Sequence, residues 1–131
     1  MIITAPLRVL VSKKKWFVFN LNVYRNSHFQ ALNKAKKLYK EELKQQITLL
    51  PSLTKIQVDY YLYPKTKRRT DLGNVLSIHQ KFFEDALVEL GIIPDDDYKH
   101  IIKSTQNFGE LDKDNPRVEI EITEITDANH Y

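Results

Sequence analysis

Residues 71–91 decide the fold of this chain, and they read Asp-Leu-Gly-Asn-Val-Leu-Ser-Ile-His-Gln-Lys-Phe-Phe-Glu-Asp-Ala-Leu-Val-Glu-Leu-Gly. Apolar side chains recur at helical spacing, which predicts a helix over residues 71–90. Thr70 or Asp71 can cap its start, and Gly91 stands where a left-handed C-terminal residue is expected. His79 falls on the apolar side, which predicts a core histidine whose hydrogen bonds are satisfied.

The opposite face of the same helix is a narrow polar stripe. Ile78 and Val88 interrupt it, so we expect other parts of the chain to cover this face in part. The stripe carries Asp71, Asn74, Lys81 and Asp85.

The segments on either side of this helix predict strands and one further helix. Residues 2–11 and 16–24 are rich in β-forming residues and predict two strands that can pair as a hairpin. Residues 28–48 follow helical spacing, after Asn26 and Ser27, which can cap a helix. Further strands are predicted over 54–63, 98–105 and 117–125, the last with Val118, Ile120 and Ile122 inward.

This order of elements predicts an α+β fold: a mixed sheet of four or five strands with two main helices packed on it. The length of 131 residues suits a single domain. We expect that domain to cover residues 1–126 and the tail 127–131 to be frayed.

Composition excludes several kinds of chemistry. The sequence has no Cys, which excludes a disulfide, a thiolate metal site and a cysteine nucleophile and fits a reducing cytoplasm. The first residues lack the basic and apolar pattern of a signal peptide. No apolar run approaches the length of a membrane span, so we expect a cytoplasmic protein without a membrane partner.

The basic residues are clustered, whereas acidic residues gather after residue 84. The net charge is +3, and the basic clusters are Lys13–Lys15, Lys34–Lys40 and Lys65–Arg69. A protein that binds phosphate in one place and a divalent cation in another has this distribution, and so do many ordinary proteins. The basic loop before Asp71 can hold a nucleic-acid backbone.

An acidic run, Asp95-Asp96-Asp97, follows Gly91, where the chain can turn back toward the polar stripe. Converging carboxylates repel one another unless a cation neutralises them, and Mg²⁺ needs only two or three of them. Such a cation activates water and stabilises charge on a phosphodiester, and a neighbouring lysine can stabilise the transition state.

Each of these features also has an ordinary structural interpretation. Lys81 and Asp85 can form a surface ion pair, and Asp71 can be only a helix cap. The three consecutive aspartates can be a solvated turn, and Lys67-Arg68-Arg69 can be a solvated loop.

Three segments together resemble a known family. They are Arg68-Arg69-Thr70-Asp71-Leu72-Gly73-Asn74, Lys81-Phe82-Phe83-Glu84-Asp85-Ala86-Leu87 and Gly91-Ile92-Ile93-Pro94-Asp95-Asp96. This pattern resembles the signature of the RusA-like Holliday-junction resolvases, which are common in phages and prophages. The segments Asn22–Asn26 and Arg117–Glu124 are similar to the N-terminal segment and the last strand of that family.

The resemblance implies a homodimer that nicks four-way DNA junctions with Mg²⁺, for which Mn²⁺ can substitute, in a bacterial cell and from a prophage gene. It implies Asp71 and Asp96 as metal ligands and Lys81 as the catalytic lysine, and Asp85 matches a family aspartate. For DNA binding we expect Lys13, Lys14, Lys15, Arg25, Lys67, Arg68 and Arg69.

Two departures from the family pattern concern the metal site. Gly73 replaces the second carboxylate of the family motif, so that Asn74, Asp85 or a neighbour in the acidic run would have to substitute for it. Four extra residues precede Lys81, which is close to one helical turn and keeps its face. A junction-binding protein without catalysis and a structural or protein-interaction domain therefore remain alternatives.

Overall fold

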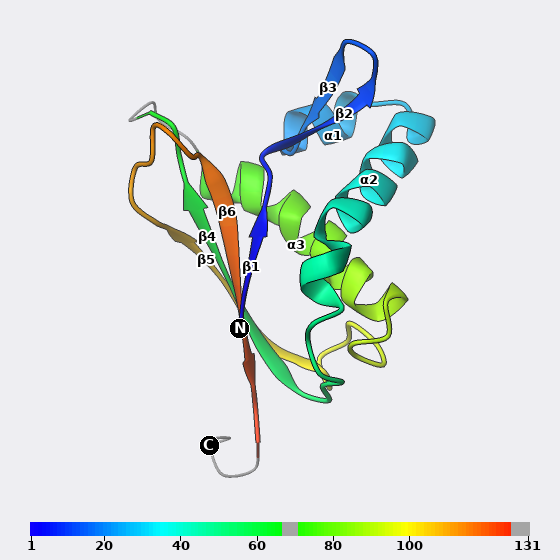
Figure 1. Cartoon of the computed structure of the whole chain (residues 1–131), viewed down its shortest axis with the longest axis vertical. Helices are drawn as coiled ribbons and strands as arrows, with labels where there is room; N and C mark the ends of the chain where they lie inside the picture. Colours follow the sequence, from blue (N-terminus) through cyan, green and yellow to red (C-terminus); the bar gives the residue numbers. More distant parts are fainter. Residues whose placement is uncertain (67–70, 127–131) are drawn as a thin grey trace.

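The computed structural model describes residues 1–66 and 71–126 and orders them as β-β-β-α-α-β-α-β-β (Figure 1). The predicted tail 127–131 lies outside the described residues. The elements are β1 (Ile2–Ala5), β2 (Arg8–Ser12), β3 (Lys15–Val18), α1 (Leu21–Asn26), α2 (Phe29–Ile47), β4 (Ile56–Tyr63), α3 (Leu72–Glu89), β5 (Ile101–Phe108) and β6 (Arg117–Glu124).

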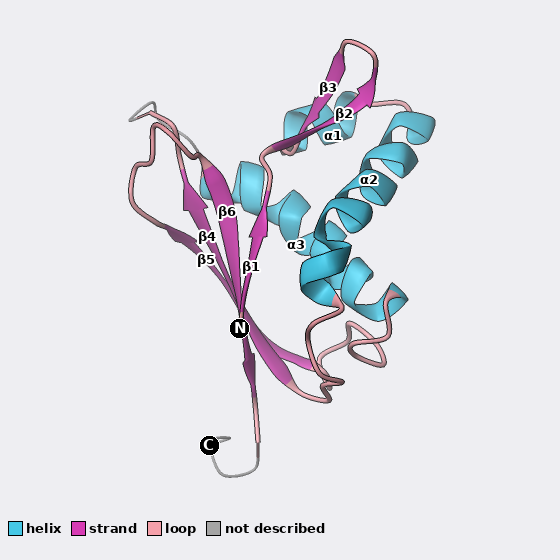
Figure 2. Ribbon diagram, viewed as in Figure 1, coloured by secondary structure: helices cyan, strands magenta, loops and turns pink. Residues whose placement is uncertain are grey.

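The main sheet of the described chain has four strands in the order β1-β6-β4-β5. β6 is antiparallel to both β1 and β4, whereas β4 and β5 are parallel. The connection between the two parallel strands contains α3, and Figure 2 shows α2 and α3 beside the sheet. This confirms the predicted α+β fold with a mixed sheet and packed helices.

The helix α3 forms where its sequence predicts it. The Asp71 side chain accepts a hydrogen bond from the Gly73 N–H at 2.9 Å, which caps the first turn. Gly91 follows the helix with a φ of 76°, the left-handed conformation that glycine adopts without strain. The next N–H, of Ile92, bonds to the Leu87 carbonyl and turns the chain back.

The first predicted strand is in fact two strands. Pro6 and Leu7 separate β1, which joins the main sheet, from β2, which pairs with β3 as a separate hairpin. The hairpin is confirmed, but the prediction of a strand over 16–24 is wrong beyond Val18. The Asn20 side chain accepts from the Val23 N–H at 2.8 Å, and this cap starts the short helix α1.

Two other boundaries differ from their predictions. α2 is capped by His28, whose side chain accepts from the Gln30 N–H, rather than by Asn26 or Ser27. Both of those residues belong instead to the end of α1. The strand predicted over 98–105 begins three residues later, because the Asp97 carbonyl accepts from the N–H groups of His100 and Ile101 and holds that segment in a turn.

The core lies between the sheet and the helices. Phe83 of α3 packs on Tyr60 of β4, with ring centroids 6.3 Å apart, and Phe82 packs on Tyr39 of α2 at 5.7 Å. β6 contributes Val118, Ile120 and Ile122, all buried as predicted. Within residues 1–66 and 71–126, no helix has the length and apolar character needed to cross a bilayer.

His79 is buried in an aromatic cluster of this core, as its position on the apolar side predicts. Its Nδ1 lies 3.0 Å from the Tyr39 hydroxyl. Its Nε2 has no hydrogen-bond partner among the described residues. The prediction of a core histidine is therefore confirmed, but the prediction that its hydrogen bonds are satisfied is wrong for Nε2. Ile78 is also buried, which confirms that the polar stripe of α3 is partly covered.

Candidate active site

A small open pocket lies along α3 where the acidic turn after the helix returns to it. Its volume is about 280 Å³. The helix contributes side chains spaced three and four residues apart, which places them on one face. The lining residues are Ser77, Gln80, Lys81, Glu84, Asp85 and Asp96.

Glu84 is the most deeply placed carboxylate of this pocket. Its Oε2 accepts a hydrogen bond from the Tyr60 hydroxyl at 2.8 Å, and the Ser104 side chain of β5 also bonds to it. Burial, together with the nearby carboxylates of Asp96 and Asp85, raises the pKa of Glu84 to about 7, against the lowering effect of these two hydrogen bonds. A carboxyl group with such a pKa exchanges its proton near neutral pH.

Asp96 reaches the pocket from the turn between α3 and β5. Loss of solvent around its side chain raises its pKa, and the carboxylates of Asp95 and Asp85 act in the same direction. The ionised forms of Glu84 and Asp96 are therefore both destabilised by neighbouring carboxylates. A cation in the pocket would relieve this repulsion.

The two charged groups of the stripe have partners on other elements. Asp85 forms an ion pair with Lys36 of α2, with Nζ and Oδ2 2.8 Å apart. Lys81 is exposed, and its Nζ lies 5.2 Å from the ring centroid of Tyr24 in α1. The i,i+4 ion pair between Lys81 and Asp85 that the sequence allows is not among the ion pairs of the described residues.

Asp71 does not share this pocket. It caps residue 73, and about 16.5 Å of helix axis separates residue 73 from residue 84. Gln106 of β5 lies beside this first turn, because a Cβ on Gly73 would lie 3.5 Å from Asp71 Oδ1 and 3.9 Å from Gln106 Oε1. Asp71 and Asp96 therefore do not line the same pocket, and the expectation that they share one cation stays a prediction.

Asn74 also lies outside the pocket, although it shares a helix face with Lys81 by spacing. Of the acidic run Asp95-Asp96-Asp97, only Asp96 lines the pocket. The Asp95 carboxylate accepts from the Asp96 N–H at 2.8 Å, and the Asp97 carboxylate accepts from the Lys99 N–H at 3.0 Å. Asp95 and Asp97 thus shape the turn, which leaves Asp96 to face the helix.

No protein-family model and no curated protein matches the sequence.

The metal-binding capacity of the described residues is limited. Among residues 1–66 and 71–126, no group of three or more His, Cys, Asp or Glu side chains is arranged to hold a metal ion. Mg²⁺ does not need such a group, because it keeps several waters and often binds through one or two carboxylates together with substrate phosphates. Glu84 and Asp96 fit that weaker requirement, since both line the pocket and both carry raised pKa values.

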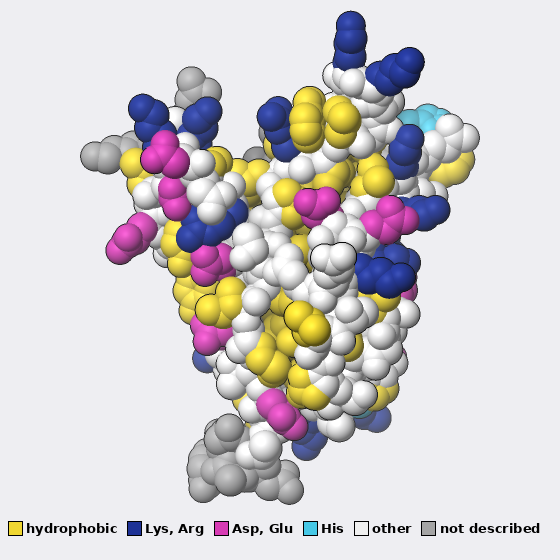
Figure 3. Space-filling model, viewed as in Figure 1, with side chains coloured by type: hydrophobic (Ala, Val, Ile, Leu, Met, Phe, Trp, Pro, Cys, Tyr) yellow, Lys and Arg dark blue, Asp and Glu magenta, His cyan; other side chains and the backbone are white. Residues whose placement is uncertain are grey.

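Four of the basic residues expected to bind DNA are described by the structure, and none of them lines the pocket. Lys13, Lys14 and Lys15 are exposed at the tip of the β2–β3 hairpin, where Figure 3 shows basic side chains projecting from the molecule. Arg25 is exposed in the last turn of α1. Lys67, Arg68 and Arg69 lie outside the described residues.

The sequence patterns did not predict Glu84 as a site residue, nor Tyr60 and Ser104 as its hydrogen-bond partners. Glu84 follows Ser77 and Gln80 at helical spacing, which was the available signal. Which flank of the polar stripe faces β5 depends on how α3 rolls on the sheet, and no local pattern specifies that rotation.

Proposed function

We propose that this chain is a Mg²⁺-dependent, structure-selective DNA endonuclease that cuts four-way junctions, with its hydrolytic centre at Glu84, Asp96 and Lys81. The observation that carries the proposal is the clustering of the partly buried Glu84 with Asp85 and Asp96 beside an exposed lysine in one open pocket. The family resemblance of residues 68–97 supplies the substrate class, junctions in DNA recombination and repair in a bacterial cytoplasm. It also supplies the homodimer.

Each of the three residues has a distinct part in this proposal. A bound Mg²⁺ would supply a polarised water and neutralise charge on the scissile phosphate. Glu84 and Asp96 would hold the ion, and Asp85 would contribute when it leaves its ion pair with Lys36. Lys81, exposed on the same rim, would stabilise negative charge that develops on the phosphate.

Asp71 has a different role in this proposal from the one that the family resemblance implies. Its carboxylate caps the first turn of α3 and is not among the side chains that line the pocket. Asparagine is as good a helix cap as aspartate. Asp71→Asn is therefore expected to cut at close to the parent rate if the centre is at Glu84, and to lose cutting if the resemblance assigns the ligand correctly.

A second function is favoured by the same geometry. Since Asp71 does not line the pocket that Asp96 lines, and the described residues offer no group of three metal-binding side chains, the chain would also suit a junction-binding protein without catalysis. Such a protein binds branched DNA with a steep salt dependence and yields no product with any divalent ion.

The deciding experiment is a cleavage assay on synthetic four-way junctions with Mg²⁺, Mn²⁺ or EDTA. We expect cutting with either metal ion and none with EDTA. Glu84→Gln, Asp96→Asn and Lys81→Met should each lower the rate by about 100-fold or more, because each removes a charge from the centre.

Asp95→Asn is the matched control, because it removes the same charge from the same turn, keeps the cap on the Asp96 N–H and lies outside the pocket lining. It should retain most of the activity. Tight junction binding without product under either metal ion would establish the non-catalytic alternative. Equal losses in Asp96→Asn and Asp95→Asn would remove Asp96 from the centre.

A further inference from the structure

A second and larger cleft opens between the β2–β3 hairpin and one end of the main sheet. Its volume is about 710 Å³, and Figure 3 shows a hollow with basic side chains on both of its sides. Segments far apart in the sequence form it: the β1–β2 junction, Trp16 of β3, α2, Lys65 after β4, and the start of β6.

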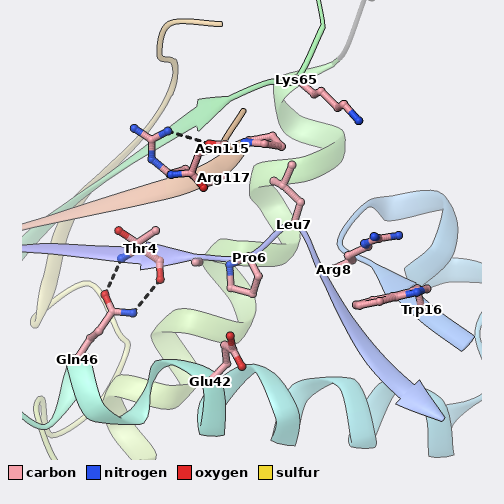
Figure 4. Close-up of a pocket in the computed structure, with 12 residues that line it drawn as sticks. Thr4, Pro6, Leu7, Arg8, Trp16, Glu42, Gln46, Lys65, Asn115 and Arg117 are labelled. Atoms are coloured by element: carbon pink, nitrogen blue, oxygen red, sulfur yellow. Dashed lines mark hydrogen bonds between the residues drawn. The ribbon is translucent and has the colours of Figure 1, made fainter. Parts of the chain in front are cut away.

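The walls of the cleft are held by hydrogen bonds. The Gln46 side chain accepts from the Thr4 N–H at 2.8 Å and donates to the Thr4 carbonyl at 2.9 Å (Figure 4). Arg117 is fixed on the opposite side by ion pairs of 2.7 Å to Asp112 and Glu119. The cleft is thus built before any ligand enters.

The positive charge available to a ligand in this cleft comes from Arg8 and Lys65 rather than from Arg117. Arg117 is neutralised by its two carboxylate partners, whereas no carboxylate among residues 1–66 and 71–126 forms an ion pair with Arg8 or Lys65. Figure 4 shows both side chains extending toward the same open space. Glu42 is the opposing charge in the lining.

Trp16 adds an aromatic surface beside this charge. Its side chain is exposed, and the Arg8 guanidinium lies 4.0 Å from its ring centroid. Trp16 and Arg8 also line the adjoining hollow of about 460 Å³, so this stacked pair stands between two contiguous depressions. Glu41 and Glu42 line the second hollow, which makes the side nearer Lys65 the better place for a phosphate.

We propose that this cleft binds a single-stranded segment of DNA, with an unpaired base on the Trp16–Arg8 stack and its phosphates on Arg8 and Lys65. Aromatic rings and guanidinium planes stack unpaired bases, whereas the bases of a duplex are already stacked on one another. The outward face of the sheet is a poorer place for a polyanion, because Asp59, Glu119 and Glu121 lie on it. The inference rests on the proposed function for its substrate, and it requires that base pairs next to the branch point open on the protein.

Trp16 is the single tryptophan of the chain, so its fluorescence reports on the cleft directly. The experiment titrates the parent protein in EDTA with a single-stranded deoxyoligonucleotide, the matching blunt duplex, the matching RNA strand and inorganic tripolyphosphate. We expect saturable quenching by the DNA strand, with little change from the duplex or tripolyphosphate. Absence of quenching by the DNA strand, or equal quenching by tripolyphosphate, would overturn the proposal.

Variants then separate stacking from charge, with labelled oligonucleotides and fluorescence anisotropy as the measurement. Trp16→Ala should weaken single-strand binding about tenfold or more and Trp16→Phe much less. Lys65→Gln should lower the slope of log affinity against log salt by about one. Glu42→Gln should tighten binding, because it removes the opposing carboxylate from the lining.

Lys44→Gln is the control, since Lys44 is exposed on α2 but lies outside the cleft lining. Equal effects of Lys65→Gln and Lys44→Gln, or an equal loss of duplex and single-strand binding in Trp16→Ala, would overturn the proposal. Because EDTA prevents metal-dependent cutting, this test and the cleavage assay can fail independently.

Discussion

The Tyr60 hydroxyl donates a hydrogen bond to Glu84 Oε2 across 2.8 Å, joining the central strand β4 to the helix α3. Tyr60 is fully buried, and burial raises the pKa of its hydroxyl well above the ordinary value. Glu84 is buried only in part, and its other side faces the pocket. The bond therefore anchors the pocket carboxylate to the core without closing it off.

The raised pKa of Glu84 predicts a specific dependence of stability on pH. The carboxyl titrates near 4.5 when unfolded and at about 7 in the folded chain. The unfolded state therefore loses its proton first, and the free energy of unfolding falls as pH rises from 4.5 to 7, by at most about 1.4 kcal/mol per pH unit. Glu84→Gln should remove this fall, as urea unfolding at pH 4.5 and 8 would measure.

A matched control for that prediction is Glu89→Gln on the same helix. Hydrogen bonding to Lys40 lowers the pKa of Glu89, so this substitution should not stabilise the chain at pH 8. Added Mg²⁺ at pH 8 should raise the melting temperature of the parent more than that of Glu84→Gln. If Glu84→Gln and the parent show the same pH profile, the carboxyl is ionised at an ordinary pKa.

His79 predicts a loss of stability in acid. Burial lowers its pKa from 6.5 to about 3, so the folded state stays neutral while the unfolded state gains a proton. The free energy of unfolding should therefore fall with decreasing pH below 6.5, by up to about 1.4 kcal/mol per pH unit.

The test compares His79→Phe with the double variant Tyr39→Phe/His79→Phe. The single change leaves the Tyr39 hydroxyl without its partner and should cost about 1–3 kcal/mol at pH 7, whereas removing both partners should cost less. Both variants should lose the acid sensitivity in urea unfolding at pH 7 and 4.5. An unchanged acid sensitivity in the double variant would assign it to another group.

Much of this fold could be predicted from the sequence, because local patterns determine it. The caps of α3 at Asp71 and Gly91 and the strict alternation in β6 require no knowledge of distant contacts. α1 was missed because Leu21 and Val23 suit a strand as well as a helix. The Asn20 cap that decides between the two is a single hydrogen bond.

The candidate site was less predictable than the fold. Spacing along α3 placed Lys81 and Asp85 on one face, and both line the pocket with Asp96. It also placed Asp71 on that face, but a shared face does not bring together residues many turns apart. Because each residue adds about 1.5 Å of rise, only a return of the chain near residue 71 could have joined it to Asp96. The turn returns near Glu84 instead.

Removal of the ion pair between Lys36 and Asp85 should lower the stability of the chain slightly and strengthen its binding of a cation. Lys36→Met should cost less than about 1 kcal/mol of stability, since the pair is partly exposed. It should also lower the Mg²⁺ concentration needed for half-maximal stabilisation, because Asp85 becomes free to face the pocket. Lys40→Met is the control, as Lys40 pairs with Glu89 and not with Asp85. Equal shifts in the Mg²⁺ titrations of the two variants would contradict a role for Asp85.

Replacement of glycine by alanine should have opposite effects on stability at Gly109 and at Gly73. A Cβ on Gly109 would lie 2.6 Å from the Tyr63 ring, which is itself held under the Arg117 guanidinium at 4.2 Å. Gly109→Ala should therefore destabilise the chain by about 1–3 kcal/mol, as overpacking generally does.

Gly73 is in the first turn of α3, where an added Cβ meets its nearest neighbour at an ordinary contact distance of 3.5 Å. Gly73→Ala should stabilise the chain by about 0.5–1 kcal/mol, because alanine loses less conformational entropy in a helix. Gly73→Asp has the same room for its Cβ and restores the carboxylate of the family motif beside Asp71. If the hydrolytic centre is at Glu84, Gly73→Asp leaves the cleavage rate unchanged, and a rate increase would move the centre to the start of the helix.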